Sequence, residues 1–218
     1  MSYAIKECFF TLQGEGKNSG RAAVFLRFAG CNLWSGLERD RAKAICNFCD
    51  TEFVGTDGEG GGKFRTAEDL ARHARAFWPG EVATHIAPFL VCTGGEPLLQ
   101  LDADLIQALK AATFEIAIET NGTLEAPDGI DWICVSPKAG AEARGVKFVQ
   151  KSGHELKLIY PQAGLDPADY EALDFKHFFL QPMDGEDIEA NTAAAIDYCQ
   201  AHPQWRLSVQ MHKLVGIR

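Results

Sequence analysis

Apolar segments of strand length alternate along this chain with amphipathic segments of helical period, and this alternation restricts the fold more than any other feature. Strands are predicted at residues 22–30, 86–93, 114–120, 131–136, 154–160 and 177–181, and helices at 66–78, 101–112, 167–174 and 187–201. The alternation predicts an α/β fold with a mainly parallel sheet. Only a short polar link joins the strands at 114–120 and 131–136, which argues against a complete eight-unit barrel. A truncated α/β barrel and an open α/β sheet both remain.

Polar or glycine-rich motifs directly follow five of the predicted strands. They are a cysteine loop beginning at Cys31, TGGEP at 93–97, TNG at 120–122, SPK at 136–138 and QPMD at 181–184. In parallel α/β folds, ligands bind at the carboxyl ends of the strands. Five such motifs at one edge therefore predict an enzyme whose site lies there.

Length, charge and cysteine usage narrow the class of protein further. The 218 residues predict a single domain over 1–218, and the formal net charge of −9 argues against nucleic acid or an anionic membrane as a partner. No run reaches membrane-spanning length, and the first residues lack the apolar core of a signal peptide. Seven cysteines without an export signal favour a reducing compartment. We expect a cytoplasmic protein.

Three of the seven cysteines lie close together, at Cys31, Cys46 and Cys49, in a C-x14-C-x2-C arrangement. Cys92, Cys134 and Cys199 lie in apolar segments and are expected in the core. Spacing alone leaves two interpretations of the three open: a zinc loop completed by a fourth ligand, or an iron–sulfur site. Three thiolates on a [4Fe-4S] cluster leave one iron free to bind a small molecule, which gives a reason for an odd number of ligands.

The motifs together resemble a known family. The CNFC pair with a lone cysteine upstream and GGEP downstream resembles radical S-adenosylmethionine (SAM) enzymes, although their usual spacing is C-x3-C-x2-C. The longer gap leaves residues 32–45 as an insert. With TLQGEG, TGGEPLLQ, ETNGT, SPK, QPMD and the closing HK, the sequence resembles the 7-carboxy-7-deazaguanine synthases over nearly its whole length.

The resemblance implies a fold, a reaction and a set of cofactors. The fold would be the truncated (partial) βα barrel of radical SAM enzymes. The reaction would convert 6-carboxy-5,6,7,8-tetrahydropterin to 7-carboxy-7-deazaguanine with loss of ammonia, in queuosine or deazapurine precursor biosynthesis. A [4Fe-4S] cluster, SAM and Mg²⁺ would be needed, with SAM regenerated. The resemblance also implies a homodimer and an electron donor such as flavodoxin or ferredoxin.

It further implies roles for individual residues. Cys31, Cys46 and Cys49 would hold the cluster, and Thr51, or alternatively Asp50, would bind Mg²⁺. Residues expected to contact SAM are Phe48, Cys49, Asp50, Gly94, Gly95, Glu96, Ser136, Pro137, Lys138, Gln181, Pro182, Met183 and Asp184. Residues expected to contact the pterin are Leu12, Gln13, Gly14, Glu15, Arg27, Thr93, His212 and Arg218.

Physical chemistry supports some of these roles. Gly94 and Gly95 would let the backbone approach the methionine end of SAM, and Glu96 would accept from its ammonium group. A carboxylate such as Glu15 can accept two hydrogen bonds from the amide–amidine edge of a pterin. Arg27 lies in an apolar strand, where it is either a snorkelling edge residue or a partner for the substrate carboxylate.

Two other functions remain open from sequence. A glycyl-radical activating enzyme also carries a cysteine triad but acts on a protein partner, so turnover of a small molecule without a partner would argue against it. A zinc-stabilised binding module without redox chemistry would be colourless and contain stoichiometric zinc.

Overall fold

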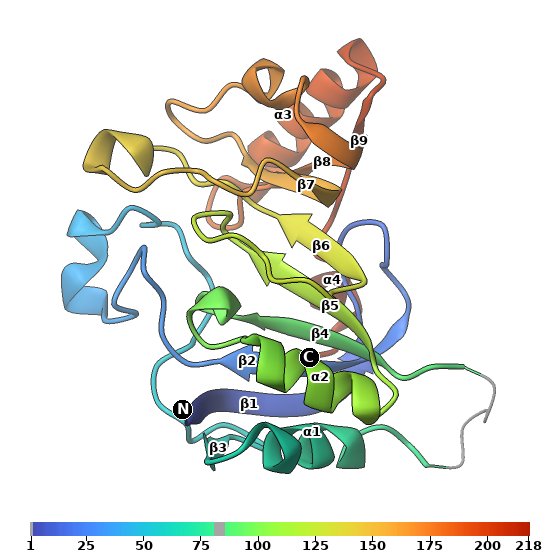
Figure 1. The fold of residues 1–218 in the computed structure, drawn as a ribbon. Coiled ribbons are helices and arrows are strands. Elements are labelled where there is room, and N and C mark those ends of the chain that lie inside the picture. Colours follow the sequence, from blue (N-terminus) through green and yellow to red (C-terminus); the bar gives the residue numbers. More distant parts are fainter. Residues whose placement is uncertain (1, 81–85) are drawn as a thin grey trace.

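Residues 2–80 and 86–218, the part of the chain described by our computed structural model, contain one nine-stranded sheet (Figure 1). The strand order is β3-β1-β2-β4-β5-β6-β7-β8-β9. The strands are β1 (Tyr3–Leu12), β2 (Ala22–Phe28), β3 (Gly62–Phe64), β4 (Phe89–Gly94), β5 (Glu115–Thr120), β6 (Trp132–Val135), β7 (Ser152–Tyr160), β8 (Asp174–Pro182) and β9 (Trp205–Leu207).

The sheet is mainly parallel and is not closed into a barrel. Neighbouring strands from β2 to β9 pair in parallel, whereas β1 pairs antiparallel with both β2 and β3. The predicted α/β class, mainly parallel sheet and incomplete barrel are therefore confirmed. The sequence analysis did not predict β1, because its mixed polar and apolar residues do not follow a simple alternation; the register also shifts between Ile5 and Glu7.

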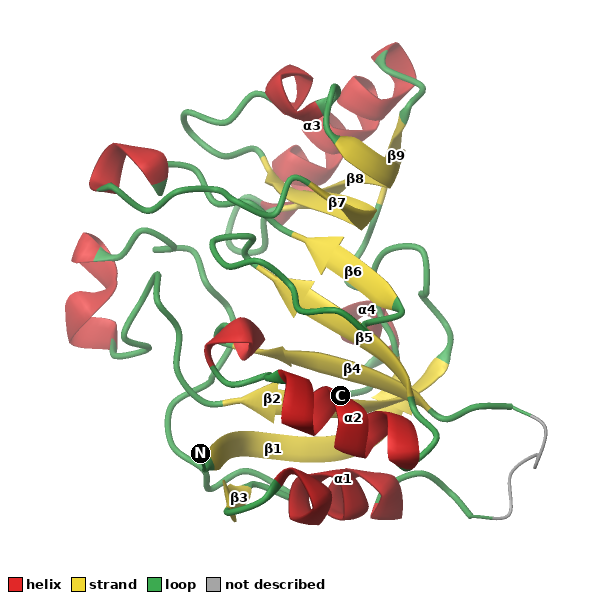
Figure 2. Cartoon of the chain, in the orientation of Figure 1, coloured by secondary structure: helices red, strands yellow, loops and turns green. Residues whose placement is uncertain are grey.

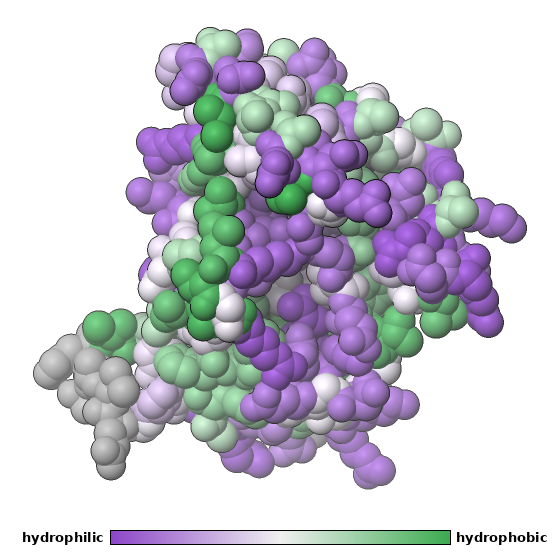
Figure 3. Space-filling model, turned by 180° about the vertical axis from the view of Figure 1, so that it is seen from behind, coloured by the Kyte–Doolittle hydropathy of each residue, from purple (hydrophilic) through white to green (hydrophobic). Residues whose placement is uncertain are grey.

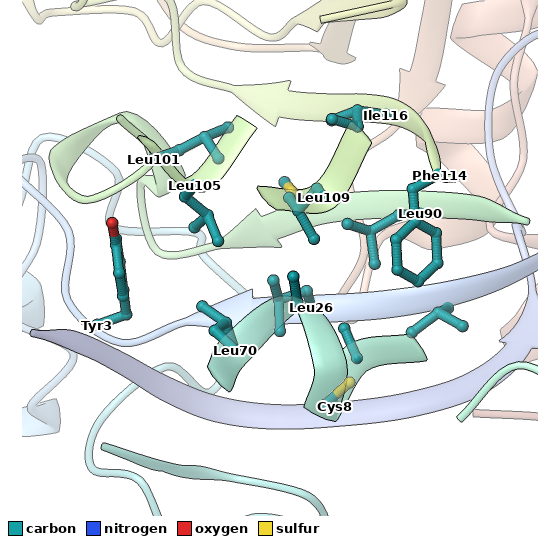
Figure 4. Close-up of a cluster of buried hydrophobic side chains, with 14 of the residues drawn as sticks. Tyr3, Cys8, Leu26, Leu70, Leu90, Leu101, Leu105, Leu109, Phe114 and Ile116 are labelled. Atoms are coloured by element: carbon teal, nitrogen blue, oxygen red, sulfur yellow. The ribbon is translucent and has the colours of Figure 1, made fainter. Parts of the chain in front are cut away.

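Two helices, α1 (Ala67–Ala76) and α2 (Ala103–Ala111), cover one face of the β1–β5 half of the sheet (Figure 2). Figure 4 shows Leu70 of α1 and Leu105 and Leu109 of α2 among the apolar side chains of these strands. Thr66 accepts a hydrogen bond from the Asp69 amide at 3.1 Å, so the predicted helix start is correct. Burying these leucines contributes to the stability of this half of the fold.

A second apolar cluster lies under α3 (Ile188–Ala201) and involves β6 to β9. The helix predicted at 167–174 is only a short 3-10 helix, η4 (Pro167–Tyr170), because Asp174 already begins β8. The other short elements are η1 (Glu38–Lys43), η2 (Pro97–Leu99), η3 (Glu142–Arg144) and α4 (Met211–Val215). Cys92 and Cys134 are buried as expected, and Cys199 is partly buried against the second cluster. Among the described residues, no helix is long and apolar enough to cross a membrane.

Candidate active site

The sheet face opposite α1 and α2 carries polar side chains on six of its strands. In β2, β4 and β5, Leu26, Cys92 and Ile118 belong to the apolar cluster under the helices, and the next residue of each strand points the other way. The resulting row, here called the polar row, comprises Glu7 (β1), Arg27 (β2), Thr93 (β4), Glu119 (β5), Lys157 (β7) and Gln181 (β8). All six line a cavity of about 440 Å³, a volume typical of small-molecule sites. Viewed from this side, the molecule is hollowed at its centre and largely hydrophilic there (Figure 3).

The three clustered cysteines lie at one end of this cavity. Cys31, Cys46 and Cys49 all line it, in the long loop that follows β2. The Leu33 amide donates to the Cys31 sulfur at 3.4 Å. A hydrogen bond from the Cys46 thiol lowers the pKa of Cys49 and raises that of Cys46. Binding of a metal requires both cysteines as thiolates.

The donor chemistry of the three cysteines, three thiols on one loop, suits an iron–sulfur cluster. In the described part of the chain, no three or more His, Cys, Asp or Glu side chains are grouped closely enough to hold one metal ion. A [4Fe-4S] cluster makes a different demand, because each cysteine binds a different iron atom. Three thiols around one end of a cavity that continues toward polar groups suit that requirement.

The insert at 32–45 contacts the backbone of the turn that carries Cys46 and Cys49. Arg41, in η1, donates to the carbonyl oxygens of Asn47 and Cys49, each at 3.0 Å. Its guanidinium lies 4.2 Å from the centre of the Trp34 ring. The insert also touches the segment after β6, where Arg144 donates to the Lys43 carbonyl; in Figure 1, η1 (light blue) and η3 (yellow) lie at the same edge of the sheet. The insert thus holds the Cys46–Cys49 turn in place.

Gly94 and Gly95 pack the end of β4 against the cysteine loop. The Gly95 amide donates to the Phe28 carbonyl at 3.3 Å, and the Glu96 amide donates to the Gly30 carbonyl at 2.9 Å. A β-carbon on Gly95 would lie 2.0 Å from the Gly30 carbonyl oxygen and 2.8 Å from the Cys31 β-carbon. Glycine is required here by the close approach of two backbones.

Gly95→Ala should therefore destabilise the protein by about 2 kcal/mol, because backbone must move to accommodate the methyl group. Urea-induced unfolding of the purified variant measures the change. Gly80→Ala is the matched control, since a β-carbon at Gly80 meets no atom within 4 Å. Equal stability of Gly95→Ala and the unmodified protein would contradict this account of the turn.

Glu96 is fully buried and holds the turn after β5. Its carboxylate accepts from the Thr120 hydroxyl at 2.8 Å, the Asn121 amide at 2.8 Å and the Leu98 amide at 3.0 Å. Burial raises the pKa of Glu96, while these donors favour its ionised form. Glu96 is not among the residues that line the cavity. Its contacts tie the TGGEP and TNG motifs together.

The loop between β1 and β2 and the C-terminal segment meet over the other end of the cavity. The Met211 amide donates to the Gly14 carbonyl at 3.0 Å, and a β-carbon on Gly14 would lie 2.3 Å from His212 Nδ1. Lys213 bridges Asp50 at 2.7 Å and Asp184 at 2.6 Å. The C-terminal segment thereby joins the clamp of residues 13–16 to the loops at the carboxyl ends of the strands.

Twenty-two of the predicted site residues line this one cavity, and two do not. Glu96 and Pro137 lie outside it, both buried. Those that line it are Leu12, Gln13, Gly14, Glu15, Arg27, Cys31, Cys46, Phe48, Cys49, Asp50, Thr51, Thr93, Gly94, Gly95, Ser136, Lys138, Gln181, Pro182, Met183, Asp184, His212 and Arg218. Arg27 is already paired with Glu7 at 2.7 Å, and Arg218 also contacts Glu7.

Sequence reasoning missed several polar residues of the cavity. Lys157 is the clearest, with an ammonium 2.6 Å from Glu15 and 3.0 Å from Glu119. Its signal was available, because a lysine inside the apolar strand HELKLIY is as unusual as Arg27 in its strand. Glu7 and Gln210 were missed as well, whereas Asn121 and Lys213 belong to the TNG and HK motifs but were given no role of their own.

Comparison with known proteins finds relatives that match over the whole chain. The chain is 61% identical to the 7-carboxy-7-deazaguanine synthase of Caulobacter vibrioides and 58% identical to that of Burkholderia multivorans, each alignment covering 100% of both chains. Its structure is similar to that of QueE from Escherichia coli, with a TM-score of 0.68, 28% sequence identity and coverage of 97% of this chain and 95% of that one. None of the protein-family models compared with the sequence matches it.

The open α/β sheet, the cysteine loop and these relatives define an enzyme of the radical SAM type. More narrowly, the chain belongs to the 7-carboxy-7-deazaguanine synthase family.

Proposed function

We propose that this enzyme converts 6-carboxy-5,6,7,8-tetrahydropterin to 7-carboxy-7-deazaguanine with loss of ammonia, using a [4Fe-4S] cluster, SAM and Mg²⁺. The observation that carries the proposal is the cavity itself, which has three cysteines at one end and a polar clamp at the other. Bound together and reduced by one electron, the cluster and SAM supply the radical that removes a hydrogen atom from the substrate. The chain's own residues bind and orient the two ligands.

The cysteine end would hold the cluster through Cys31, Cys46 and Cys49 and SAM next to it. Phe48, Asp50, Gly94 and Gly95 line the same cavity as these cysteines, as do Ser136 and Lys138 of the SPK motif and all four residues of QPMD. Ser136 accepts from the Lys138 ammonium at 2.6 Å, which places a positive charge in this part of the cavity. A cation suits the carboxylate of SAM. Glu96 would act indirectly, by holding the neighbouring turn.

The clamp end would hold the pterin. Hydrogen bonds from Lys157 and Gln210 favour the charged form of Glu15, so that its pKa lies below the ordinary value despite burial. An ionised carboxylate accepts hydrogen bonds from the amide–amidine edge of a pterin better than a protonated carboxyl group does. Arg27, Arg218 and His212 provide positively charged or hydrogen-bonding groups near the same end, suited to the carboxylate of the substrate.

Thr51 would hold Mg²⁺ together with a substrate oxygen and water. Thr51→Val should raise the Mg²⁺ concentration needed for half-maximal activity by about tenfold or more, because it removes a ligand oxygen without changing the volume of the side chain. Thr51→Ser keeps the hydroxyl and serves as the matched control. A titration of activity with Mg²⁺ measures this concentration in both variants. An unchanged Mg²⁺ requirement in Thr51→Val would favour Asp50 as the Mg²⁺ ligand.

Domain organisation, compartment, oligomeric state and electron donor belong to the same proposal. We propose that the chain folds as one domain over residues 1–218, acts in the cytoplasm as a homodimer, and receives electrons from flavodoxin or ferredoxin. It would bind neither nucleic acid nor membranes. Size-exclusion chromatography with light scattering tests the dimer.

One anaerobic reaction tests the proposed function. It contains the cluster-reconstituted enzyme, SAM, Mg²⁺, dithionite and 6-carboxy-5,6,7,8-tetrahydropterin, with no other protein, and is read by mass spectrometry. We expect 7-carboxy-7-deazaguanine in excess over enzyme. Formation of 5′-deoxyadenosine with the pterin unchanged would instead favour an activating enzyme with a protein partner. A colourless, zinc-containing protein without SAM cleavage would overturn the radical mechanism.

A further inference from the structure

Lys157 is one of the most deeply buried charged groups in the described part of the chain. Its side chain is 4% exposed and lies on β7, where Leu156 and Leu158 point to the opposite, apolar side. Lysine at such a position is stable as a cation only if anionic partners compensate for lost hydration. Two of its N–H groups donate to carboxylates, Glu15 at 2.6 Å and Glu119 at 3.0 Å.

These contacts are part of a closed ring of hydrogen bonds. Gln13 Nε2 donates to the other oxygen of Glu119 at 3.3 Å, and the Glu15 amide donates to Gln13 Oε1 at 3.1 Å. The ring therefore runs from Lys157 through Glu119 and Gln13 to Glu15 and back. It connects the clamp loop, which follows β1, with β5 and β7 in the centre of the sheet. Both carboxylates line the cavity.

The charges around Lys157 explain why it remains protonated. Burial alone would lower the pKa of Lys157, but the surrounding acidic groups raise it well above the ordinary value. From β8, the residue in register with Lys157 is Phe179, which adds no charge. The titratable groups that face the lysine or its partners are Glu15, Glu119, Glu155, Cys134 and His212.

We propose that Lys157 is a positioning residue that fixes the direction of the Glu15 and Glu119 carboxylates at the substrate end of the cavity. The inference rests on the proposed function, because it takes Glu15 as a contact of the pterin. The ammonium, in contact with both carboxylates, favours the charged form of Glu15 and holds the two side chains in fixed directions. It also holds the clamp loop against the sheet before the substrate arrives, so that little ordering is needed on binding.

The test measures pterin affinity, rather than turnover, as a function of pH. Anaerobic calorimetry with 6-carboxy-5,6,7,8-tetrahydropterin and the SAM-loaded holoenzyme gives Kd across the pH range in which Glu15 titrates. For Lys157→Met we expect Kd at neutral pH to rise about 30-fold or more, as when one partner of a buried charge pair is removed. Binding should weaken as Glu15 becomes protonated at low pH, and we call the midpoint of this loss the acid limb. In Lys157→Met we expect the acid limb to lie about 1 pH unit or more higher, because loss of the cation raises the pKa of Glu15.

Two further variants separate positioning from mere support of the fold. Lys157→Arg keeps the charge, so its acid limb should stay at the position of the unmodified enzyme. Glu119→Gln removes the competing carboxylate and keeps the lysine, so its acid limb should move to lower pH. Lys110→Met, which breaks a partly exposed pair with Asp131, is the control for loss of a lysine and should change neither quantity.

The outcomes are distinct. An acid limb that does not move in Lys157→Met, with Kd within threefold of the unmodified enzyme, would overturn the proposal. Should Lys157→Met fail to fold, the direction of the shift in Glu119→Gln decides, and an unmoved or upward limb overturns it. SAM cleavage to 5′-deoxyadenosine without pterin, measured in each variant, reports on the cluster end. If the unmodified enzyme cleaves SAM but binds no pterin, the proposed function fails, independently of Lys157.

Discussion

Replacing Cys49 by serine is expected to remove the cluster and with it all cleavage of SAM. The Cys49 thiol has the lowered pKa of the cysteine pair and lies where Arg41 fixes the backbone carbonyl. Serine is a weak iron ligand at neutral pH because its hydroxyl is not ionised. Iron in the anaerobically purified protein should fall from about four atoms per chain to below about one, together with loss of the brown absorbance.

Cys199→Ser is the matched control for this substitution. Cys199 lies on α3, partly buried against the second apolar cluster and not among the cavity residues. The Cys199→Ser protein should retain its iron and its cleavage of SAM. Full iron content and SAM cleavage in Cys49→Ser would refute the assignment of Cys49 as a cluster ligand.

Glu96→Gln is expected to lower the free energy of unfolding by about 3 kcal/mol, since hydrogen bonds to a buried charged group contribute about 1.5–3 kcal/mol each. The carboxylate accepts from Thr120, Asn121 and Leu98, whereas an amide offers one acceptor oxygen and turns its NH2 group toward a donor. Urea-induced unfolding without SAM measures the loss.

The same variant distinguishes two roles for Glu96. If the residue holds the β5 turn, stability falls even without SAM; if it instead contacts the SAM ammonium, stability stays unchanged and only SAM affinity falls. Glu115→Gln removes a carboxylate from a partly exposed pair with Arg21 and should cost less than about 1 kcal/mol. A Glu96→Gln protein as stable as this control would favour direct contact with SAM.

Sequence reasoning was most successful where a motif directly follows an apolar strand. The carboxyl end of a parallel strand fixes where the next residues lie, so TGGEP, SPK and QPMD could be assigned to one edge before any coordinates were known. The helix beginning after Thr66 was predictable for a similar reason, since its cap depends on residues close in sequence.

Interactions between distant segments could not be predicted in this way. Glu96 was assigned to SAM from its motif, but its carboxylate is occupied by donors of the β5 turn. Lys157 stands out in its apolar strand, but its partners, Glu15 and Glu119, lie 142 and 38 positions away, so the ion pairs themselves could not be predicted. Only the pairing of β1 with β2 and the order of the strands bring such residues together, and neither follows from local pattern.

The clamp over the cavity has a consequence for the synthesis of the chain. The Gly16 amide donates to the Ser208 hydroxyl at 3.0 Å, across 192 positions. The β1–β2 loop and the cysteine loop leave the ribosome well before residues 208–213 do. Contacts of the clamp with residues 208–213 cannot form until those residues have emerged. In each newly made molecule, the substrate clamp is therefore completed only after the cysteine loop has been synthesised.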